Sequence, residues 1–138
     1  MKLPKRANPG GPFPVCRGRC HCGQVQIRVR LPDRVTVHRC NCSICTKTGY
    51  LHLFVERDGL QLIRGKGTLN EYRFNTGLAR HYFCRICGVK PFYVPRSHPD
   101  GYSVNLNCLE PGELPEVSIE DFDGLNWEEN VENLRKHP

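Results

Sequence analysis

The sequence has no long apolar run. No stretch approaches the roughly 20 residues that a membrane-spanning helix needs, and the first 15 residues, MKLPKRANPGGPFPV, lack the apolar segment of a secretory signal. The chain also has no internal repeat and no low-complexity tract. From these absences we expect a cytoplasmic protein that makes no use of a membrane.

Large apolar residues are also scarce. Only 38% of the 138 residues are hydrophobic, and 13 glycines and 11 prolines interrupt the apolar pattern. This length fits one domain. We expect a flexible tail at residues 1–15 and a single domain at residues 16–138, with a core too thin to stabilise the fold alone.

Cysteine, in contrast, is abundant. The nine cysteines include tight groups of the forms CxC, CxCxxC and CxxC. Neighbours this close are poorly placed to form disulfides with each other, but they suit a shared metal ion. Without an export signal, this density indicates metal binding rather than a disulfide framework.

The charge is uneven along the chain. Residues 1–39 carry nine Lys/Arg and one acid, whereas residues 110–138 carry nine acids and two bases. The formal net charge is +6. Zinc with four thiolates carries −2 and zinc with three carries −1, so two such sites lower +6 to +3. We therefore consider nucleic acid an unlikely partner and expect the bases near the cysteines to balance thiolate charge.

Short alternating segments predict an all-β domain. In GQVQIRVRL the residues Val25, Ile27, Val29 and Leu31 share one face. Further strands are expected in RVTVHR, YLHLFV, LQLIR, TLNEYRF, RHYFC, VKPFYV and GYSVNLNCL. The segment NWEENVENLRK predicts a short C-terminal helix, with Trp127 as an anchor in the core.

Two pairs of cysteines can form a closed site. Cys20 and Cys22 are two residues apart in an extended segment, so both sulfurs can face one ion. Cys84 and Cys87 form a CxxC turn followed by Gly88. Four thiolates make a structural zinc site, although sequence alone leaves the pairing of the cysteine groups open.

The CxCxxC loop offers only three sulfurs, from Cys40, Cys42 and Cys45. An open fourth position is typical of catalytic zinc. The candidates for that position are water, an exogenous thiol, Cys108, Cys16 or a histidine. We expect Cys108 to be a buried apolar residue, Cys16 to be a free thiol at the edge of the tail, and the histidines to be strand or supporting residues. Those histidines are His21, His38, His52 and His81.

The motifs resemble those of the glutathione-dependent formaldehyde-activating enzyme family, from about Gly18 to Trp127. The resemblance rests on GRCHCGQVQIRV, CNCSICTKTGY, FNTGLARHYFCRICGVKPFYVPRS, NLNCL and DGLNWE. It implies an Mss4-like fold of small coiled β-sheets. It also implies a structural zinc on Cys20, Cys22, Cys84 and Cys87, and a reactive, catalytic zinc on Cys40, Cys42 and Cys45.

The resemblance further implies a carbon–sulfur lyase that joins glutathione to formaldehyde, giving S-hydroxymethylglutathione. Arg39, Lys47 or Arg85 could steer the carboxylates of glutathione. Asn41 stands where the enzyme branch usually has histidine, which resembles the centromere protein V branch more closely.

The sequence leaves three other functions to compare with this one. They are a non-catalytic carrier that binds glutathione or a similar thiol, a zinc-ribbon-like nucleic-acid module, and a methionine sulfoxide reductase of the same fold. The last needs a separate redox cysteine motif, which this sequence does not show. Tyr50, Phe83 and Phe92 could wall a pocket, but we expect each of them in the core.

Overall fold

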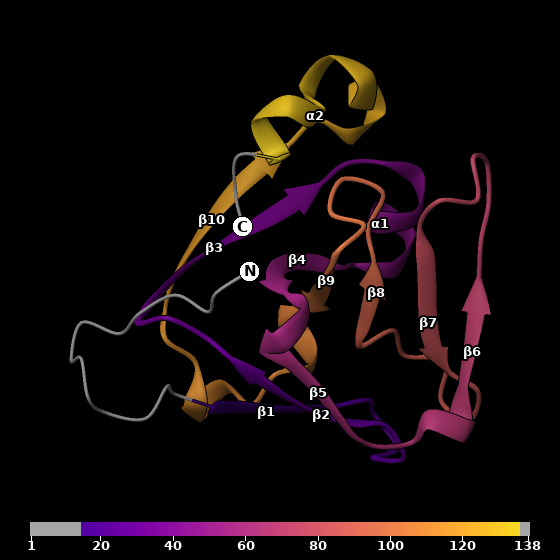
Figure 1. Cartoon of the computed structure of the whole chain (residues 1–138), viewed down its shortest axis with the longest axis vertical. Coiled ribbons are helices and arrows are strands. Elements are labelled where there is room, and N and C mark those ends of the chain that lie inside the picture. Colours follow the sequence, from indigo (N-terminus) through magenta and orange to yellow (C-terminus); the bar gives the residue numbers. More distant parts are fainter. Residues whose placement is uncertain (1–14, 136–138) are drawn as a thin grey trace.

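The computed structural model describes residues 15–135 (Figure 1). These residues form ten strands in two sheets and two short α-helices. The predicted all-β, Mss4-like class with a short C-terminal helix is confirmed. The predicted tail lies outside the described residues except for Val15, which begins the first strand.

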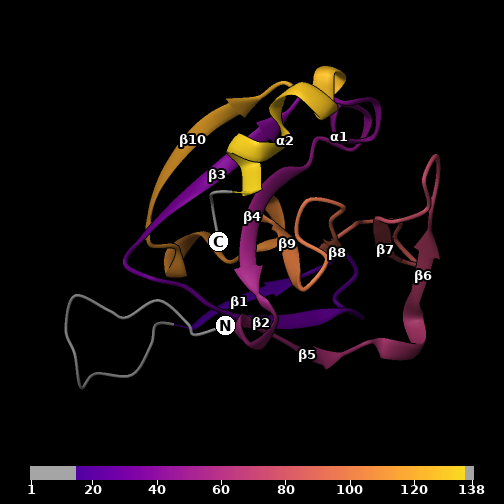
Figure 2. The same ribbon diagram turned by 45° about the horizontal axis from the view of Figure 1, so that its top comes forward.

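The smaller sheet contains, in spatial order, β1 (Val15–Arg19), β2 (Gln26–Arg30) and β5 (Leu60–Arg64). The larger sheet contains, in spatial order, β10 (Glu116–Phe122), β3 (Arg34–Cys40), β4 (Leu51–Glu56), β9 (Gly101–Asn105), β8 (Phe92–Val94), β7 (Arg80–Cys84) and β6 (Leu69–Tyr72). The helices are α1 (Ser43–Thr48) and α2 (Trp127–Arg135). Figures 1 and 2 show the smaller sheet and α2 at opposite ends of the molecule.

The main core lies between the two sheets. The predicted inward face of the first alternating segment is confirmed, because Val25, Ile27, Val29 and Leu31 are at most 2% exposed. Of these, Ile27, Val29 and Leu31 belong to the main core, whereas Val25 packs in a smaller cluster with Cys20 and Cys84. The larger sheet contributes Val35, Val37, Leu53, Val55, Phe92 and Val104 to the main core.

Strand β10 was not anticipated from the sequence. It pairs in parallel with β3, placing the acidic C-terminal region beside the basic N-terminal region. Arg34 and Glu116 form an ion pair of 2.9 Å, and Arg39 and Asp121 form one of 2.7 Å. The charge asymmetry of the sequence is therefore partly neutralised in the fold, which weakens the reading of a basic nucleic-acid face.

Two single-residue expectations were wrong. Cys16 is a free thiol, but it lies inside β1 and is 2% exposed, so it packs as a core residue rather than at the edge of a tail. Trp127 begins α2 but is only half-buried and lines a cavity, so it is not a core anchor. Within residues 15–135, no helix has the length and apolar character that crossing a membrane requires.

Candidate functional site

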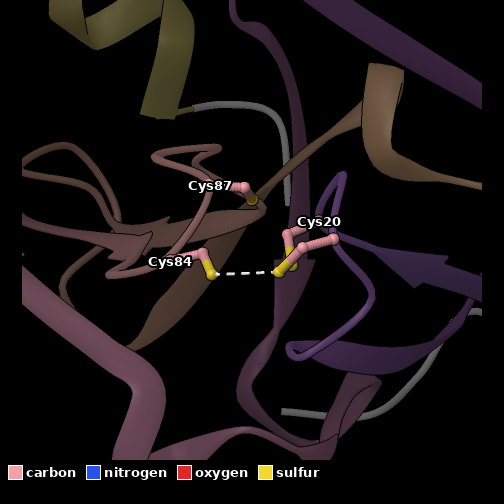
Figure 3. Close-up of side chains that lie close together, drawn as sticks. Cys20, Cys84 and Cys87 are labelled. Atoms are coloured by element: carbon pink, nitrogen blue, oxygen red, sulfur yellow. Dashed lines mark hydrogen bonds between the residues drawn. The ribbon is translucent and has the colours of Figure 1, made fainter.

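Four cysteine sulfurs meet where the two sheets approach each other. Cys20 and Cys22 come from the turn after β1, while Cys84 ends β7 and Cys87 lies in the turn that follows. Their sulfurs all lie within 4.8 Å of one another. Figure 3 shows Cys20, Cys84 and Cys87 pointing toward one another from two separate segments. We call these four residues the knuckle cluster.

The spacing in the knuckle cluster fits a zinc ion. The Sγ atom of Cys22 is 3.6 Å from those of both Cys20 and Cys84. Four sulfurs at tetrahedral corners about 2.3 Å from zinc would be about 3.8 Å apart. The backbone N–H of Val25 also donates to Cys20 Sγ at 3.3 Å, an interaction that stabilises a thiolate.

The backbone of the second turn holds its cysteines in place. Gly88 has a left-handed φ of 77°, and its N–H donates to the carbonyl of Cys84 at 2.8 Å. A side chain is strained in that conformation, so glycine suits this position. The turn thereby directs Cys84 and Cys87 toward the same space, as the sequence predicted.

The other three predicted ligands also lie together. Cys40 ends β3, Cys42 is the N-cap of α1, and Cys45 lies buried in the first turn of that helix. Residues three apart on a helix share a face, so the short α1 brings Cys42 and Cys45 to the same side. The three sulfurs lie within 4.8 Å of one another. We call these residues the loop cluster.

A glycine before α2 closes over the loop cluster. A Cβ atom at Gly124 would lie 2.3 Å from Cys40 Sγ and 3.0 Å from the Cβ of Cys42. The same segment is tied to the loop by Asn41, whose side chain donates to Asp123 Oδ1 at 3.1 Å and accepts from the N–H of Leu125 at 3.0 Å. The C-terminal region therefore fixes one wall of this site.

The three thiols of the loop cluster do not ionise equally. Hydrogen bonds from Cys40 and Cys45 lower the pKa of Cys42 far below its usual value. The hydrogen bond with Cys42, together with burial, raises the pKa of Cys40 to about 11. Hydrogen bonds with Cys40 and Cys42, together with burial, raise the pKa of Cys45 as well. Ionisation of all three thiols at this spacing would need a cation to balance the charge, and a divalent metal ion would meet that need.

His52 supports the loop cluster from β4. Its Nε2 atom lies 2.9 Å from Cys45 Sγ, and its Nδ1 atom lies 3.0 Å from the hydroxyls of both Tyr93 and Ser103. Burial lowers the pKa of His52 to about 3, so the ring is neutral. If a metal held Cys45 as a thiolate, which can only accept, the proton of the ring would lie on Nε2 and Nδ1 would accept from a hydroxyl. His52 therefore contacts the loop cluster, and its supporting role remains a prediction.

A buried cation stands beside these groups. Lys90 is 7% exposed, and its Nζ lies 3.9 Å from the ring centre of Tyr93 and 4.5 Å from that of Tyr50. Burial lowers the pKa of Lys90 to about 8, while the loop-cluster thiolates oppose that shift. Nζ also lies 2.6 Å from Nδ1 of His81. At neutral pH Lys90 remains protonated and donates to that nitrogen.

The loop cluster opens onto a cavity of about 290 Å³. This volume is near the lower end of the range for small-molecule sites. Most of the wall is aromatic or apolar, and Arg96 also lines it. Its described lining includes Cys40, Cys42, Cys45, His38, His52, His81, Phe54, Phe74, Tyr93, Phe122, Leu125 and Trp127.

Comparison with known proteins agrees with this geometry. Residues 15–122 match the family described as glutathione-dependent formaldehyde-activating enzyme. The chain belongs to this family. It is 29% identical over 121 residues to a Halomonas elongata protein, covering 78% of this chain and 76% of that protein. That relative is provisionally named a glutathione-dependent formaldehyde-activating enzyme.

A solved structure shares the fold. The crystal structure of a Rhodobacter sphaeroides protein is 35% identical to this family member and superposes with a TM-score of 0.63. The similarity covers 75% of this chain and 99% of that one.

Several other predicted residues lie outside the two clusters. Cys108 is half-buried in the 3₁₀ turn after β9, with its Sγ 3.9 Å from the carbonyl of Lys90. Arg39 pairs with Asp121 instead of facing the cavity. Tyr50 and Phe92 are buried, and Phe83 is half-buried. Lys47 and Arg85 are exposed, and neither lines the cavity within the described part of the chain.

Sequence reasoning missed Lys90, Arg96 and Gly124. A lysine in VKPFYV, at an inward position among aromatic residues, was a usable signal for a buried cation. The other two depend on how the C-terminal segment packs over the cysteine loop. That contact joins residues more than 80 positions apart, and no local pattern encodes it.

Proposed function

We propose that this family member is a zinc-dependent carbon–sulfur lyase that joins glutathione, or a similar thiol, to formaldehyde. The observation that supports this function best is the position of the loop cluster. It offers three sulfurs and lines a cavity with a mostly apolar wall. Three protein ligands facing a cavity match the build of catalytic zinc sites.

The two clusters take different roles in this proposal. The knuckle cluster, with Cys20, Cys22, Cys84 and Cys87, holds a structural zinc that joins the two sheets. The loop cluster, with Cys40, Cys42 and Cys45, holds the reactive zinc. Zinc there supplies positive charge at an open coordination position, which lowers the pKa of a thiol bound to it.

The proposed reaction is a single addition step. The thiolate sulfur attacks the carbonyl carbon of formaldehyde, and a carbon–sulfur bond forms as the carbon–oxygen π bond breaks. The released electron pair moves to oxygen, which takes a proton equivalent to the one lost from the thiol. The product is S-hydroxymethylglutathione when the thiol is glutathione.

His81 is suited to the oxygen end of this reaction. Its Nε2 atom is buried and has no hydrogen-bond partner among the described residues, although the side chain lines the cavity. Because the Lys90 ammonium donates to Nδ1, the proton of the neutral ring lies on Nε2. We assign this N–H to the carbonyl oxygen, where it stabilises the developing negative charge.

The aromatic part of the cavity wall also supports the addition. Phe74 and Tyr93 stack on His81, with ring centres 5.4 and 4.7 Å from its own. This packing fixes the plane of the imidazole and keeps water away from it. A fixed donor costs less reorganisation in the transition state than a mobile one.

Thiols add to formaldehyde without a catalyst, so the test must measure a rate. Exchange spectroscopy by NMR gives the rate of S-hydroxymethylglutathione formation above the uncatalysed background. We expect acceleration by the wild type and by Cys108→Ala, and none by Cys42→Ser. Glutathione binding with no acceleration in the wild type would show that the protein is a thiol carrier.

The structure gives Asn41 a local role, because both ends of its amide contact the segment before α2. The closer resemblance to the centromere protein V branch remains a prediction. A cytoplasmic location also remains a prediction, and it suits thiolate ligands that must stay reduced.

A further inference from the structure

Arg96 is the one arginine or lysine among the described residues that line the cavity. Its side chain is 24% exposed, so the guanidinium is largely withdrawn from water. It follows β8 and faces the start of α2. The cavity therefore has a sulfur cluster in one part of its wall and a permanent positive charge in another.

The guanidinium is held in a fixed orientation. The Cζ atom of Arg96 lies 3.5 Å from the ring centre of Trp127, which is a close cation–π contact. This stacking covers one face of the guanidinium and leaves its N–H edge to bind acceptors. A planar, oriented guanidinium matches the geometry of a carboxylate.

A carboxylate already occupies that edge. Arg96 Nη2 donates to Oε1 of Glu128, the second residue of α2. The Glu128 side chain is 80% exposed, so it can turn into solvent at little cost. An incoming carboxylate in the cavity can therefore replace it.

We infer that Arg96 forms a carboxylate subsite, through which the cavity selects thiols that carry a carboxylate over neutral thiols. The inference rests on the proposed function in one respect, that a thiol is the ligand of the loop cluster. Glu128 acts as an internal competitor for the same subsite. Trp127 orients Arg96 and so positions it for the substrate.

A structural role for Arg96 is the main alternative. The stack on Trp127 could simply fix the start of α2, in which case any thiol would suffer equally when Arg96 is lost. The two roles differ only when the charge of the ligand is varied. Glutathione and its diethyl ester provide that comparison, because the ester keeps the peptide and the thiol but lacks both carboxylates.

The experiment measures the dissociation constants of both thiols by calorimetry, using zinc-loaded protein. The variants are Arg96→Met, Glu128→Gln and the control Arg135→Met. Arg135 also lies near Trp127, at 5.8 Å from its ring centre, but it pairs with Glu132 and lies outside the described cavity lining. Trp127 is the single tryptophan, so its emission reports binding next to Arg96.

We expect Arg96→Met to weaken glutathione binding by about tenfold to a hundredfold, the usual loss for a hydrogen bond to a charged group. The ester should bind the wild type and Arg96→Met equally. Glu128→Gln should tighten glutathione binding by about twofold to fivefold, because an exposed ion pair is weak. Arg135→Met should change neither.

Equal weakening of both thiols in Arg96→Met, or no weakening of either, would overturn the inference. If the wild type still accelerates the addition in those cases, the proposed function stands without this subsite. If the charge dependence is as expected but no acceleration occurs, the subsite stands and the catalytic proposal fails. If the wild type binds neither thiol, both fail.

Discussion

Replacing Cys84 by serine should unfold the domain or bring it close to unfolding. Cys84 is fully buried and forms a small cluster with Cys20 and Val25, separate from the main core. This small cluster has three buried residues, so in our proposal the zinc, more than apolar packing, joins β7 to the turn after β1. Serine keeps the size of the side chain but removes the thiolate that zinc needs.

The magnitude follows from the chain that the site encloses. Cys22 and Cys84 are 62 residues apart. A cross-link closing a loop of that size stabilises a fold by about 4 kcal/mol in the chain-entropy relation used for disulfides. Structural zinc in small finger peptides contributes more, about 10–16 kcal/mol. A whole domain is stable by only about 5–15 kcal/mol.

The expected result is aggregation during expression, or a melting temperature at least about 12 °C lower, taking about 3 °C per kcal/mol. Circular dichroism melting with a zinc count per chain makes the test. Cys108→Ala is the matched control, since that half-buried cysteine belongs to neither cluster. A soluble Cys84→Ser protein with wild-type melting and one zinc fewer would refute the reasoning.

Three further predictions concern the loop cluster and the cavity onto which it opens. The His52→Phe variant should fold, but the affinity of the loop cluster for zinc should fall by about tenfold to a hundredfold, the usual effect of losing a partner of a metal ligand. The amide of His52→Gln can replace Nε2, so this variant should retain most of the zinc affinity. A competition with a chelator measures both. Gly124→Ala should expel the second zinc, because the new Cβ would meet Cys40 Sγ at 2.3 Å, whereas Gly112→Ala meets nothing within 4 Å and should keep two zincs per chain. His81→Phe should leave the dissociation constant of glutathione unchanged and slow its addition to formaldehyde about 100-fold or more; equal effects on binding and rate would argue against the assigned N–H.

The strands of the core were predictable because their alternation is strong and local. Val25, Ile27, Val29 and Leu31 show a period of two in the sequence and face the core in the structure. Strand β10 lacks that signal, because five of the seven residues in Glu116–Phe122 are exposed and three are acidic. It is held by its pairing with β3, and such a long-range contact cannot be inferred from local composition.

The candidate site was likewise predictable only where its signal is local in the sequence. Each cysteine group is compact in sequence, so the two clusters could be predicted from spacing and chemistry alone. The charged residues around these clusters could not be predicted in this way. Arg39 looked suited to steering because it precedes Cys40, yet Asp121 pairs with it. Arg96 instead reaches the cavity from the end of β8, because α2 folds back over it.

The most direct test of the central claim asks whether glutathione binds the metal of the loop cluster through sulfur. Cobalt replaces zinc in both clusters, and its thiolate absorption band rises with the number of sulfurs bound. We predict that glutathione strengthens this band in the wild type and leaves it unchanged in Cys42→Ser, which should fold and keep about one metal ion per chain. A wild-type spectrum that ignores glutathione would mean that the fourth position is filled by the protein itself, and the enzymatic proposal for this family member would then be wrong.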